Sequence, residues 1–250
     1  MKKIWTLFLA GLLTFSLAAC GSTAESGEPQ SSYSQTESAE ESTAPASSRA
    51  ASPAGESGAS SAGSGSHILI AYFSRVGNTD FEEGVDAITS ASLNLEGDTL
   101  VGNAEVLARM AQQETGGELF RIETVEKYPS DYDETTDVAA AEQDADARPE
   151  LASHVENMDS YDTVILIYPN WWGTLPQPLF TFLEEYDFSR KTILPLCTHG
   201  GSRMGRSEQD IAALCPGANL IEGLAASGSS VYEAGADVAE WIANSGILEG

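Results

Sequence analysis

The sequence predicts an α/β domain in which a five-stranded parallel sheet is covered by helices on both faces. Short apolar runs alternate along the chain with segments of helical periodicity, an order typical of parallel sheets. Three of these runs end in loops rich in Gly, Ser, Thr and Asn, and ligands of such sheets bind beyond the strand ends. The predicted strands span residues 67–73, 118–123, 163–168, 191–196 and 219–224.

The strands are predicted from their apolar patterns. Residues 67–73, 163–168 and 191–196 are nearly continuous apolar runs, as expected of strands that are buried on both faces. Residues 118–123 alternate polar and apolar side chains, which suits a strand nearer the edge of the sheet. Residues 219–224 supply the fifth run.

The helices are predicted from amphipathic spacing. The first covers residues 105–114, places Val106, Leu107 and Met110 on one face, and has Asn103 as its expected N-cap. Further helices are predicted over residues 133–148, 178–186, 207–214 and 232–244.

Composition divides the chain into three segments. Residues 1–20 combine two lysines, an apolar stretch too short to span a bilayer and a small-residue end, which favours a secretory signal over a transmembrane anchor. Its last residues, Leu-Ala-Ala-Cys-Gly, resemble a bacterial lipobox, which implies that Cys20 carries lipid at the mature N-terminus. Residues 21–66 are rich in Ser, Ala, Gly and Glu and predict a disordered tether. We therefore expect residues 67–250 to be a folded domain, lipid-anchored outside the cytoplasmic membrane.

The net charge and the cysteine content argue against two kinds of function, nucleic-acid binding and metal binding. The formal net charge is −26, and residues 67–250 hold 32 acidic and 9 basic side chains. Such a surface repels phosphate backbones, so nucleic acid is not an expected partner. No C-x-x-C pair or His/Cys cluster indicates a metal site. Cys197 and Cys215 are expected to pack as small buried residues, and a disulfide between them is the alternative.

The loops after three predicted strands indicate a mononucleotide site. They cover residues 74–79, 169–173 and 198–202. Backbone amides near a helix N-terminus bind phosphate without basic side chains. Trp171 and Trp172 offer flat apolar walls for a heterocycle, and at least one of them is expected to face the site. A phosphate and a flat ring together describe a mononucleotide, and flavin mononucleotide, FMN, is the obvious candidate.

The same motifs resemble the flavodoxin family. The resemblance rests on AYFSRVGNT at 71–79, GGELFRIE at 116–123, YPNWWGTLP at 168–176 and THGGS at 198–202, in this order. It implies a flavodoxin-like three-layer sandwich with strand order 2-1-3-4-5 and FMN as cofactor. The phosphate contacts that it implies are Ser74, Val76, Gly77, Asn78 and Thr79. The ring contacts that it implies are Pro169, Asn170, Trp171, Trp172, Gly173, Thr198, His199, Gly200 and Gly201.

One departure affects the phosphate site. Residues 80–101 separate the loop at 74–79 from the first amphipathic helix, and a second Gly-Asn pair at 102–103 opens that helix. Either pair could deliver its amides to the phosphate. We favour a shared site, with Ser74 and Arg75 from the strand end and Asn103 and Ala104 from the helix start, where the dipole attracts an anion. This interpretation leaves Asn78 and Thr79 open.

The function predicted from these features is that of an FMN-dependent redox protein of the electron-transfer type. Its partner would be a redox protein or a quinone-like small molecule. The alternatives are an NAD(P)H-dependent quinone or azo-type flavin reductase, and a surface lipoprotein that binds a ligand other than flavin. Because the flavin performs the chemistry, no catalytic residue is expected. His199 is expected to contact the ligand through its backbone or to form a wall of the site, and not to act as an acid or base.

Overall fold

A computed structural model of the chain describes residues 67–81 and 91–249. The predicted signal with Cys20, the tether, and residues 82–90 of the segment after the first loop lie outside the described residues. None of the helices in the described part combines the length and the apolar character needed to cross a bilayer.

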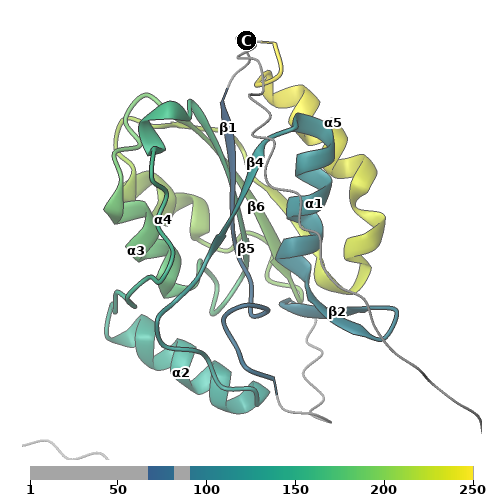
Figure 1. The fold of residues 1–250 in the computed structure, drawn as a ribbon, viewed down its shortest axis with the longest axis vertical. Coiled ribbons are helices and arrows are strands. Elements are labelled where there is room, and N and C mark those ends of the chain that lie inside the picture. The colour runs from purple at the N-terminus through teal and green to yellow at the C-terminus, as the bar shows by residue number, and fades with distance from the viewer. Residues whose placement is uncertain (1–66, 82–90, 250) are drawn as a thin grey trace, which may run out of the picture. The chain divides into compact units, whose positions relative to one another are not determined.

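The central sheet confirms the predicted fold class and strand order. Its strands follow the order β4-β1-β5-β6-β7, with β8 also pairing with β6, and every pairing is parallel. In the numbering of the predicted strands this is 2-1-3-4-5 (Figure 1). The strands are β1 (Ile68–Phe73), β4 (Glu118–Ile122), β5 (Thr163–Pro169), β6 (Thr192–His199), β7 (Asn219–Leu220) and β8 (Leu224–Ser227).

The fifth predicted strand is divided in two. β7 pairs with β6 at Ile193, and β8 resumes the pairing at Leu196. Pro195 lies between these two positions and has no backbone N–H to donate to a neighbouring strand. The single strand predicted over 219–224 is therefore interrupted at the point where Pro195 of β6 cannot donate a backbone hydrogen bond to it.

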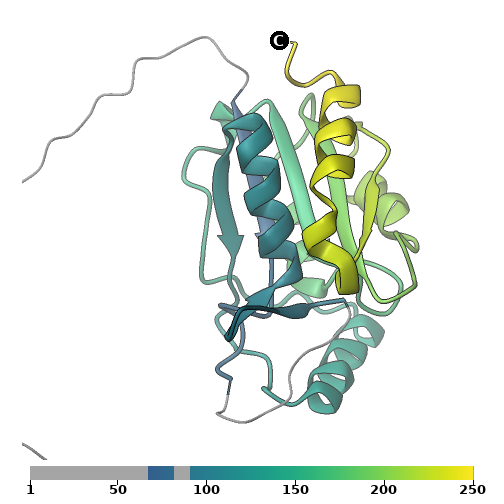
Figure 2. The same ribbon diagram turned by 90° about the vertical axis from the view of Figure 1, so that its right-hand side faces the viewer.

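Helices cover both faces of the sheet and enclose two cores. Figures 1 and 2 show α1 (Asn103–Thr115) and α5 (Gly235–Ser245) together on one face, and α3 (Gln177–Glu185) and α4 (Ser207–Leu214) on the other. Successive residues of a strand point to opposite faces, so alternate residues of β1 and β5 enter different cores. The core beneath α1 and α5 includes Ile70, Ile165 and Leu194, and the opposite core includes Leu69, Leu166 and Phe182.

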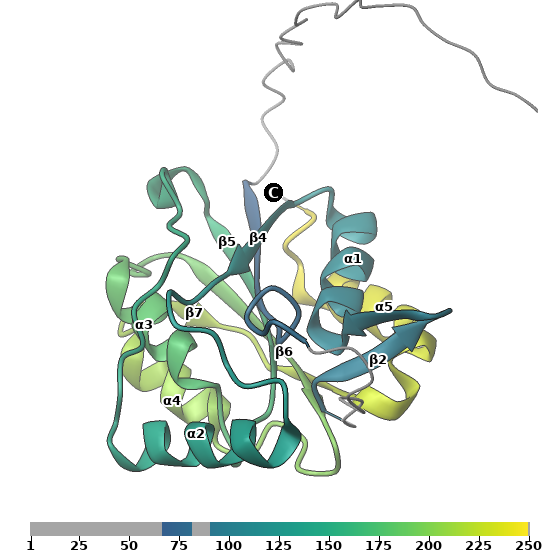
Figure 3. The same cartoon turned by 60° about the horizontal axis from the view of Figure 1, so that its bottom comes forward.

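Two further elements lie at the carboxyl ends of the strands. α2 (Tyr132–Asp144) passes across this edge, and the hairpin of β2 (Leu93–Glu96) and β3 (Thr99–Gly102) lies beside the start of α1 (Figure 3). The hairpin docks on the 3₁₀ helix η2 (Gly228–Glu233), because Asn94 Nδ2 donates to Gly228 O at 3.1 Å. A second 3₁₀ turn, η1 (Met158–Ser160), precedes β5.

Several helix boundaries differ from the prediction. Asn103 is not the N-cap of α1, because Gly102 occupies that position and the helix begins at Asn103 itself. The helix predicted over 133–148 ends at Asp144, and Asp146 then has a φ of 48° that breaks the helical path. The helix predicted over 232–244 begins later, at Gly235, because η2 precedes it.

The packing of β5 leads to a stability prediction. Leu166 is completely buried in the middle of the sheet. Leu166→Ala should lower the free energy of unfolding by about 2 to 5 kcal/mol, because it loses transfer free energy and leaves a cavity. The exposed Leu248 is the control, and Leu248→Ala should change stability by less than about 0.5 kcal/mol. Urea unfolding of the two variants measures the difference, and equal stabilities would contradict the assigned core.

Candidate functional site

The loops after β5 and β6 are bonded to each other at the carboxyl edge of the sheet. Asn170 N donates to Thr198 O at 2.7 Å, and Arg206 N donates to Gly173 O at 2.8 Å. A Cβ at Gly205 would lie 2.1 Å from Gly173 O, so only glycine allows this approach. Two of the three predicted ligand loops therefore form one rigid unit.

The start of α1 meets the end of β1 at Ser74. A Cβ built at Gly102 would lie 1.8 Å from Ser74 Oγ, so no side chain fits there. Gly102 supplies no side-chain cap, and the first-turn amides of Ala104 and Glu105 have no partner within the helix. The Ser74 hydroxyl thus lies at the N-terminus of α1, beside the first-turn amides and at the positive end of the helix dipole. This is the combination that an anion site requires.

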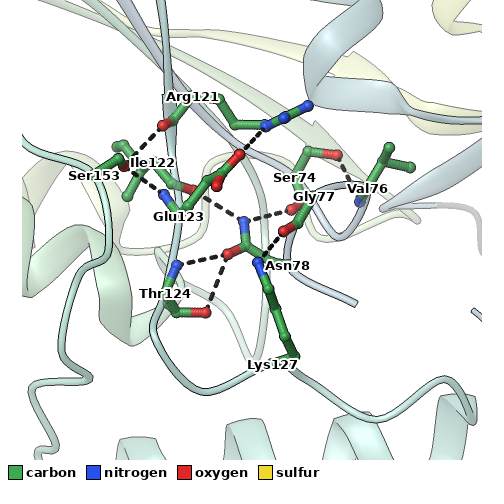
Figure 4. Close-up of polar contacts among 10 residues, drawn as sticks. All are labelled: Ser74, Val76, Gly77, Asn78, Arg121, Ile122, Glu123, Thr124, Lys127 and Ser153. Atoms are coloured by element: carbon green, nitrogen blue, oxygen red, sulfur yellow. Dashed lines mark hydrogen bonds and ion pairs between the residues drawn. The ribbon is translucent and has the colours of Figure 1, made fainter. Parts of the chain in front are cut away.

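Asn78 has a structural role in the first loop. Its Nδ2 donates to Ser74 O and Ile122 O, both at 2.9 Å (Figure 4). Its Oδ1 accepts from Thr124 N at 2.8 Å and from Thr124 Oγ1 at 3.1 Å. The buried amide thereby ties the end of β1 to the end of β4 and has no capacity left for a phosphate.

The loop after β5 is a tight turn centred on Trp172 and Gly173. Trp171 N donates to Thr174 O at 3.0 Å, and Thr174 N donates to Trp171 O at 3.1 Å. The φ angles of Trp172 and Gly173 are 50° and 83°, which is the pattern of a type I′ turn. Gly173 adopts this conformation without strain, whereas Trp172 is a non-glycine residue with positive φ.

This turn separates the two tryptophan rings. Trp171 is half-buried and packs edge-to-face on Phe73 and Tyr128, with ring centroids 5.5 and 5.2 Å away. Trp172 is 59% exposed, and its Nε1 donates to Thr136 O of α2. Of the two tryptophans, Trp172 is therefore the one with a largely exposed side chain at the strand ends.

The remaining polar side chains of the second and third loops hold the loops in place. Asn170 Nδ2 donates to Arg203 O at 2.6 Å, and its Oδ1 accepts from Gly173 N at 3.0 Å. His199 Nδ1 accepts from Gly201 N at 2.9 Å, so this ring nitrogen carries no proton. Burial and the positive charge of Arg203 both lower the pKa of His199. His199 is thus a neutral side chain bonded to its own loop.

Ala91 and Ser92 belong to the site although no sequence pattern indicated them. Thr198 Oγ1 donates to Ala91 O at 2.6 Å, and Asn103 N donates to Ser92 O at 2.9 Å. Trp171 Nε1 donates to Ser92 Oγ at 2.9 Å. These two residues therefore join the start of α1 to the loops after β5 and β6.

Basic side chains gather around the first loop. Lys127 Nζ donates to Gly77 O, and a Cβ at Gly77 would lie 2.6 Å from Arg121 Nε. Arg121 also pairs with Glu123 at 2.7 Å (Figure 4). Sequence reasoning missed both basic residues, although Arg121 lies in the alternating strand before this edge.

Arg75 lies on the other side of the strand end from the predicted phosphate site. Its Nη2 donates to Pro129 O at 2.7 Å and to Ser130 O at 3.0 Å, in the segment that leads into α2. Ser74 instead meets Gly102 at the start of α1. Ser74 and Arg75 are adjacent in sequence and were both predicted to contact the phosphate, but their side chains contact different parts of the protein.

The other candidate groups offer no chemistry of their own. Cys197 and Cys215 are free buried thiols, and burial raises the pKa of each to about 12. A buried thiol with so high a pKa holds little thiolate at neutral pH, which suits the expected packing role. Within residues 67–81 and 91–249, no group of three or more His, Cys, Asp or Glu side chains is placed to hold a metal ion.

Comparison with known proteins assigns the family. The family model for flavodoxin matches residues 99–245. The chain belongs to the flavodoxin family. The match begins at β3, so it includes the second Gly-Asn pair and excludes the first.

The chain is also similar to solved structures. A protein provisionally classed as a flavoprotein from Bacteroides uniformis is 25% identical, with a TM-score of 0.54 over 72% of this chain and 99% of that one. A similarly classed protein from Bacteroides eggerthii is 26% identical, with a TM-score of 0.50 over 70% and 98%. A flavoprotein from Lactobacillus acidophilus, solved in complex with FMN, is 19% identical, with a TM-score of 0.46 over 67% and 97%. No curated protein matches the chain.

The role assigned to Asn78 can be tested by its removal. Asn78→Ala loses four hydrogen bonds and leaves buried carbonyl and amide groups without partners, so stability should fall by at least about 2 kcal/mol. Asn219→Ala is the control, because that exposed side chain makes a single long bond of 3.4 Å. Chemical unfolding compares the two. If Asn78→Ala were as stable as the control, the structural role would be wrong.

Proposed function

We propose that residues 67–250 bind FMN and serve as a redox domain. The observation that carries this proposal is the meeting of Ser74 with the start of α1, at the same sheet edge as the bonded loops after β5 and β6. Membership of the flavodoxin family supports FMN as the cofactor. Bound FMN supplies one- and two-electron transfer, and the protein holds it and tunes its potential.

The FMN phosphate would be held at the start of α1. Ser74 Oγ and the amides of Ala104 and Glu105 are the donors, and the helix dipole favours the anion. Arg121 lies beside Gly77 of the first loop, and the charge of Glu105 in the first turn of α1 acts on it at longer range. Its positive charge offsets part of the negative field of the domain, which otherwise opposes binding of a phosphate.

The flavin ring would lie against the loops after β5 and β6. A Cβ built at Gly173 or Gly201 meets no atom of the described residues within 4 Å, so both glycines border open space. Backbone groups can therefore approach a planar ligand closely here. Trp172 adds an exposed aromatic surface at the tip of the turn.

Ala91 and Ser92 would support this site indirectly. They already accept the hydrogen bonds of Asn103 N and Thr198 Oγ1, which are two of the donors that the sequence assigned to FMN. Asn103 N and Thr198 Oγ1 would thus position α1 and β6. The direct contacts with the phosphate would then come from Ser74 and from the amides that follow Asn103 in the first turn. Ala91 and Ser92, which come from the stretch between the two Gly-Asn pairs, thus become part of the site.

The domain would act outside the cytoplasmic membrane, held there by lipid on Cys20. This part of the proposal is supported by the sequence alone, through the short apolar segment, the Leu-Ala-Ala-Cys-Gly motif and the tether of residues 21–66. Its electron partner would be a redox protein or a quinone-like small molecule.

The phosphate assignment predicts that FMN binds far better than riboflavin. Ser74→Ala should weaken FMN binding by about 1.5 to 3 kcal/mol, because one bond to a charged acceptor is lost, and should leave riboflavin binding unchanged. Ser229→Ala, at an exposed serine distant in sequence, is the matched control. Quenching of flavin fluorescence gives both affinities. Equal affinity of the wild type for FMN and riboflavin would overturn the phosphate site.

The lipid anchor predicts a change in membrane partition. Wild-type protein expressed with its first 20 residues should enter the detergent phase, and Cys20→Ala should leave it, because acyl chains attached to the cysteine supply the membrane affinity. Mass spectrometry of the N-terminal peptide identifies the modification. An unchanged membrane fraction for Cys20→Ala would show that the anchor lies elsewhere.

A further inference from the structure

The helix α2 lies across the carboxyl edge of the sheet and buries few of its side chains (Figure 3). Of its 13 residues, all of them within the described part of the chain, Thr135 and Ala139 are the two that are buried. The side chains of Tyr132 and Val138 are largely exposed. By contrast, α3 has 9 residues and buries six of them. Because a short helix in a protein depends mainly on tertiary packing, burial alone holds α2 only weakly in its place.

Two side-chain hydrogen bonds fasten α2 to the site loops. Trp172 Nε1 donates to Thr136 O at 3.1 Å, and Tyr128 Oη donates to Glu142 Oε2 at 2.8 Å. The ring of Tyr128 packs edge-to-face on Trp171, with the ring centroids 5.2 Å apart, so both donors are connected to the turn after β5. Water can replace a bond of this kind, and each one therefore adds little net stability.

The chain is fixed on both sides of α2. Before the helix, Arg75 Nη2 donates to Pro129 O at 2.7 Å and to Ser130 O at 3.0 Å. After the helix, Arg148 Nε pairs with a Glu184 carboxylate oxygen of α3 at 2.7 Å. Residues 131–147 lie between these two anchors, so they are the part that can move away from the sheet edge when the two bonds to α2 break.

Trp172 belongs both to the fastening of α2 and to the proposed ring site. Its neighbour Gly173 borders open space, because a Cβ built there meets no atom of the described residues within 4 Å. Trp172 itself has a φ of 50°, which is uncommon for a bulky residue. Such backbone outliers persist where their surroundings hold them, and they cluster at ligand clamps and switch regions. A ligand beside Gly173 therefore meets the side chain that also holds α2.

We propose that α2 is a lid on the ring site, fastened by Trp172 and Tyr128, which opens to admit FMN and closes over it. This inference rests on the FMN site proposed above. Both fastening bonds are formed in the structure, so the lid is closed. FMN beside Gly173 would add contacts to the closed lid that the open lid cannot make. Binding therefore favours closure, because a ligand shifts an equilibrium toward the state that it binds better.

Hydrogen exchange of the α2 amides in the purified full chain without FMN reports how often the lid opens. Trp172→Phe removes the Nε1 donor and keeps an aromatic ring, and Tyr128→Phe removes the hydroxyl and keeps the ring. Each variant should speed the exchange of α2 by about threefold to tenfold, which corresponds to the net worth of one hydrogen bond. Two conservative variants keep the test open if one of them does not fold.

Two matched controls lose the same kinds of bond elsewhere. Trp241→Phe removes an Nε1 bond from α5 to Glu222 O, and Tyr161→Phe removes a hydroxyl bond to the Glu118 carboxylate. Neither bond touches α2, so the exchange of α2 should stay as in the wild type in both controls.

FMN supplies the second measurement. Saturating FMN should slow the exchange of α2 in the wild type by at least about threefold, because the bound ligand favours the closed lid. In stopped-flow quenching of flavin fluorescence, Trp172→Phe and Tyr128→Phe should raise both the association and the dissociation rate constants. A lid lies on the path in both directions, so the two rate constants should change more than their ratio.

Two results would overturn the lid. One is an exchange of α2 without FMN that is the same in Trp172→Phe and Tyr128→Phe as in the two controls. The other is FMN that binds with no change in the exchange of α2 and with wild-type rate constants in both variants. Absence of any FMN binding is a different result, because it would overturn the proposed FMN site itself and this inference with it.

Discussion

The close approach of the α1 N-terminus to Ser74 is the constraint on which the rest of the site depends. Without a side chain at Gly102, the first turn of the helix reaches the end of β1 and brings the amides of Ala104 and Glu105 toward the serine hydroxyl. The chain achieves this although residues 80–101 separate the two elements in sequence. The hairpin and the Ala91–Ser92 bonds return the chain to the point at which the helix can begin.

The polar side chains of the loops serve mainly to fix backbone positions. Asn78 ties β1 to β4, and Asn170 ties the loop after β5 to the loop after β6. In the binding mode that we propose, the ligand would meet backbone amides, glycines and one serine. A site built in this way needs few charged residues, which explains how a domain with 32 acidic side chains can still offer a place for an anion.

Periodicity in the sequence was sufficient to predict the sheet and the main helices, because buried strands and amphipathic helices carry strong local signals, whereas the strand order was implied by the resemblance to the flavodoxin family. The hairpin was missed, although its sequence holds a turn signal. Gly97 and Asp98 form a two-residue turn with glycine first, and apolar residues occur on both sides of it, at 93 and 95 and at 100 and 101. The division of the fifth strand depends on Pro195 in the neighbouring strand, which the local sequence of 219–224 does not reveal. The roles of Asn78, Arg75 and Ser92 were not predictable, because each depends on partners that are distant along the chain or on the direction of a side chain.

The central claim is that the phosphate of FMN lies at the start of α1 and not at the first Gly-Asn pair. A crystal structure of the purified domain with FMN tests this most directly. Our account predicts phosphate oxygens within hydrogen-bond distance of Ser74 Oγ and the amides of Ala104 and Glu105, with the ring beside Gly173 and Gly201. A phosphate bound to the amides of Gly77, Asn78 and Thr79, with the α1 N-terminus empty, would contradict it.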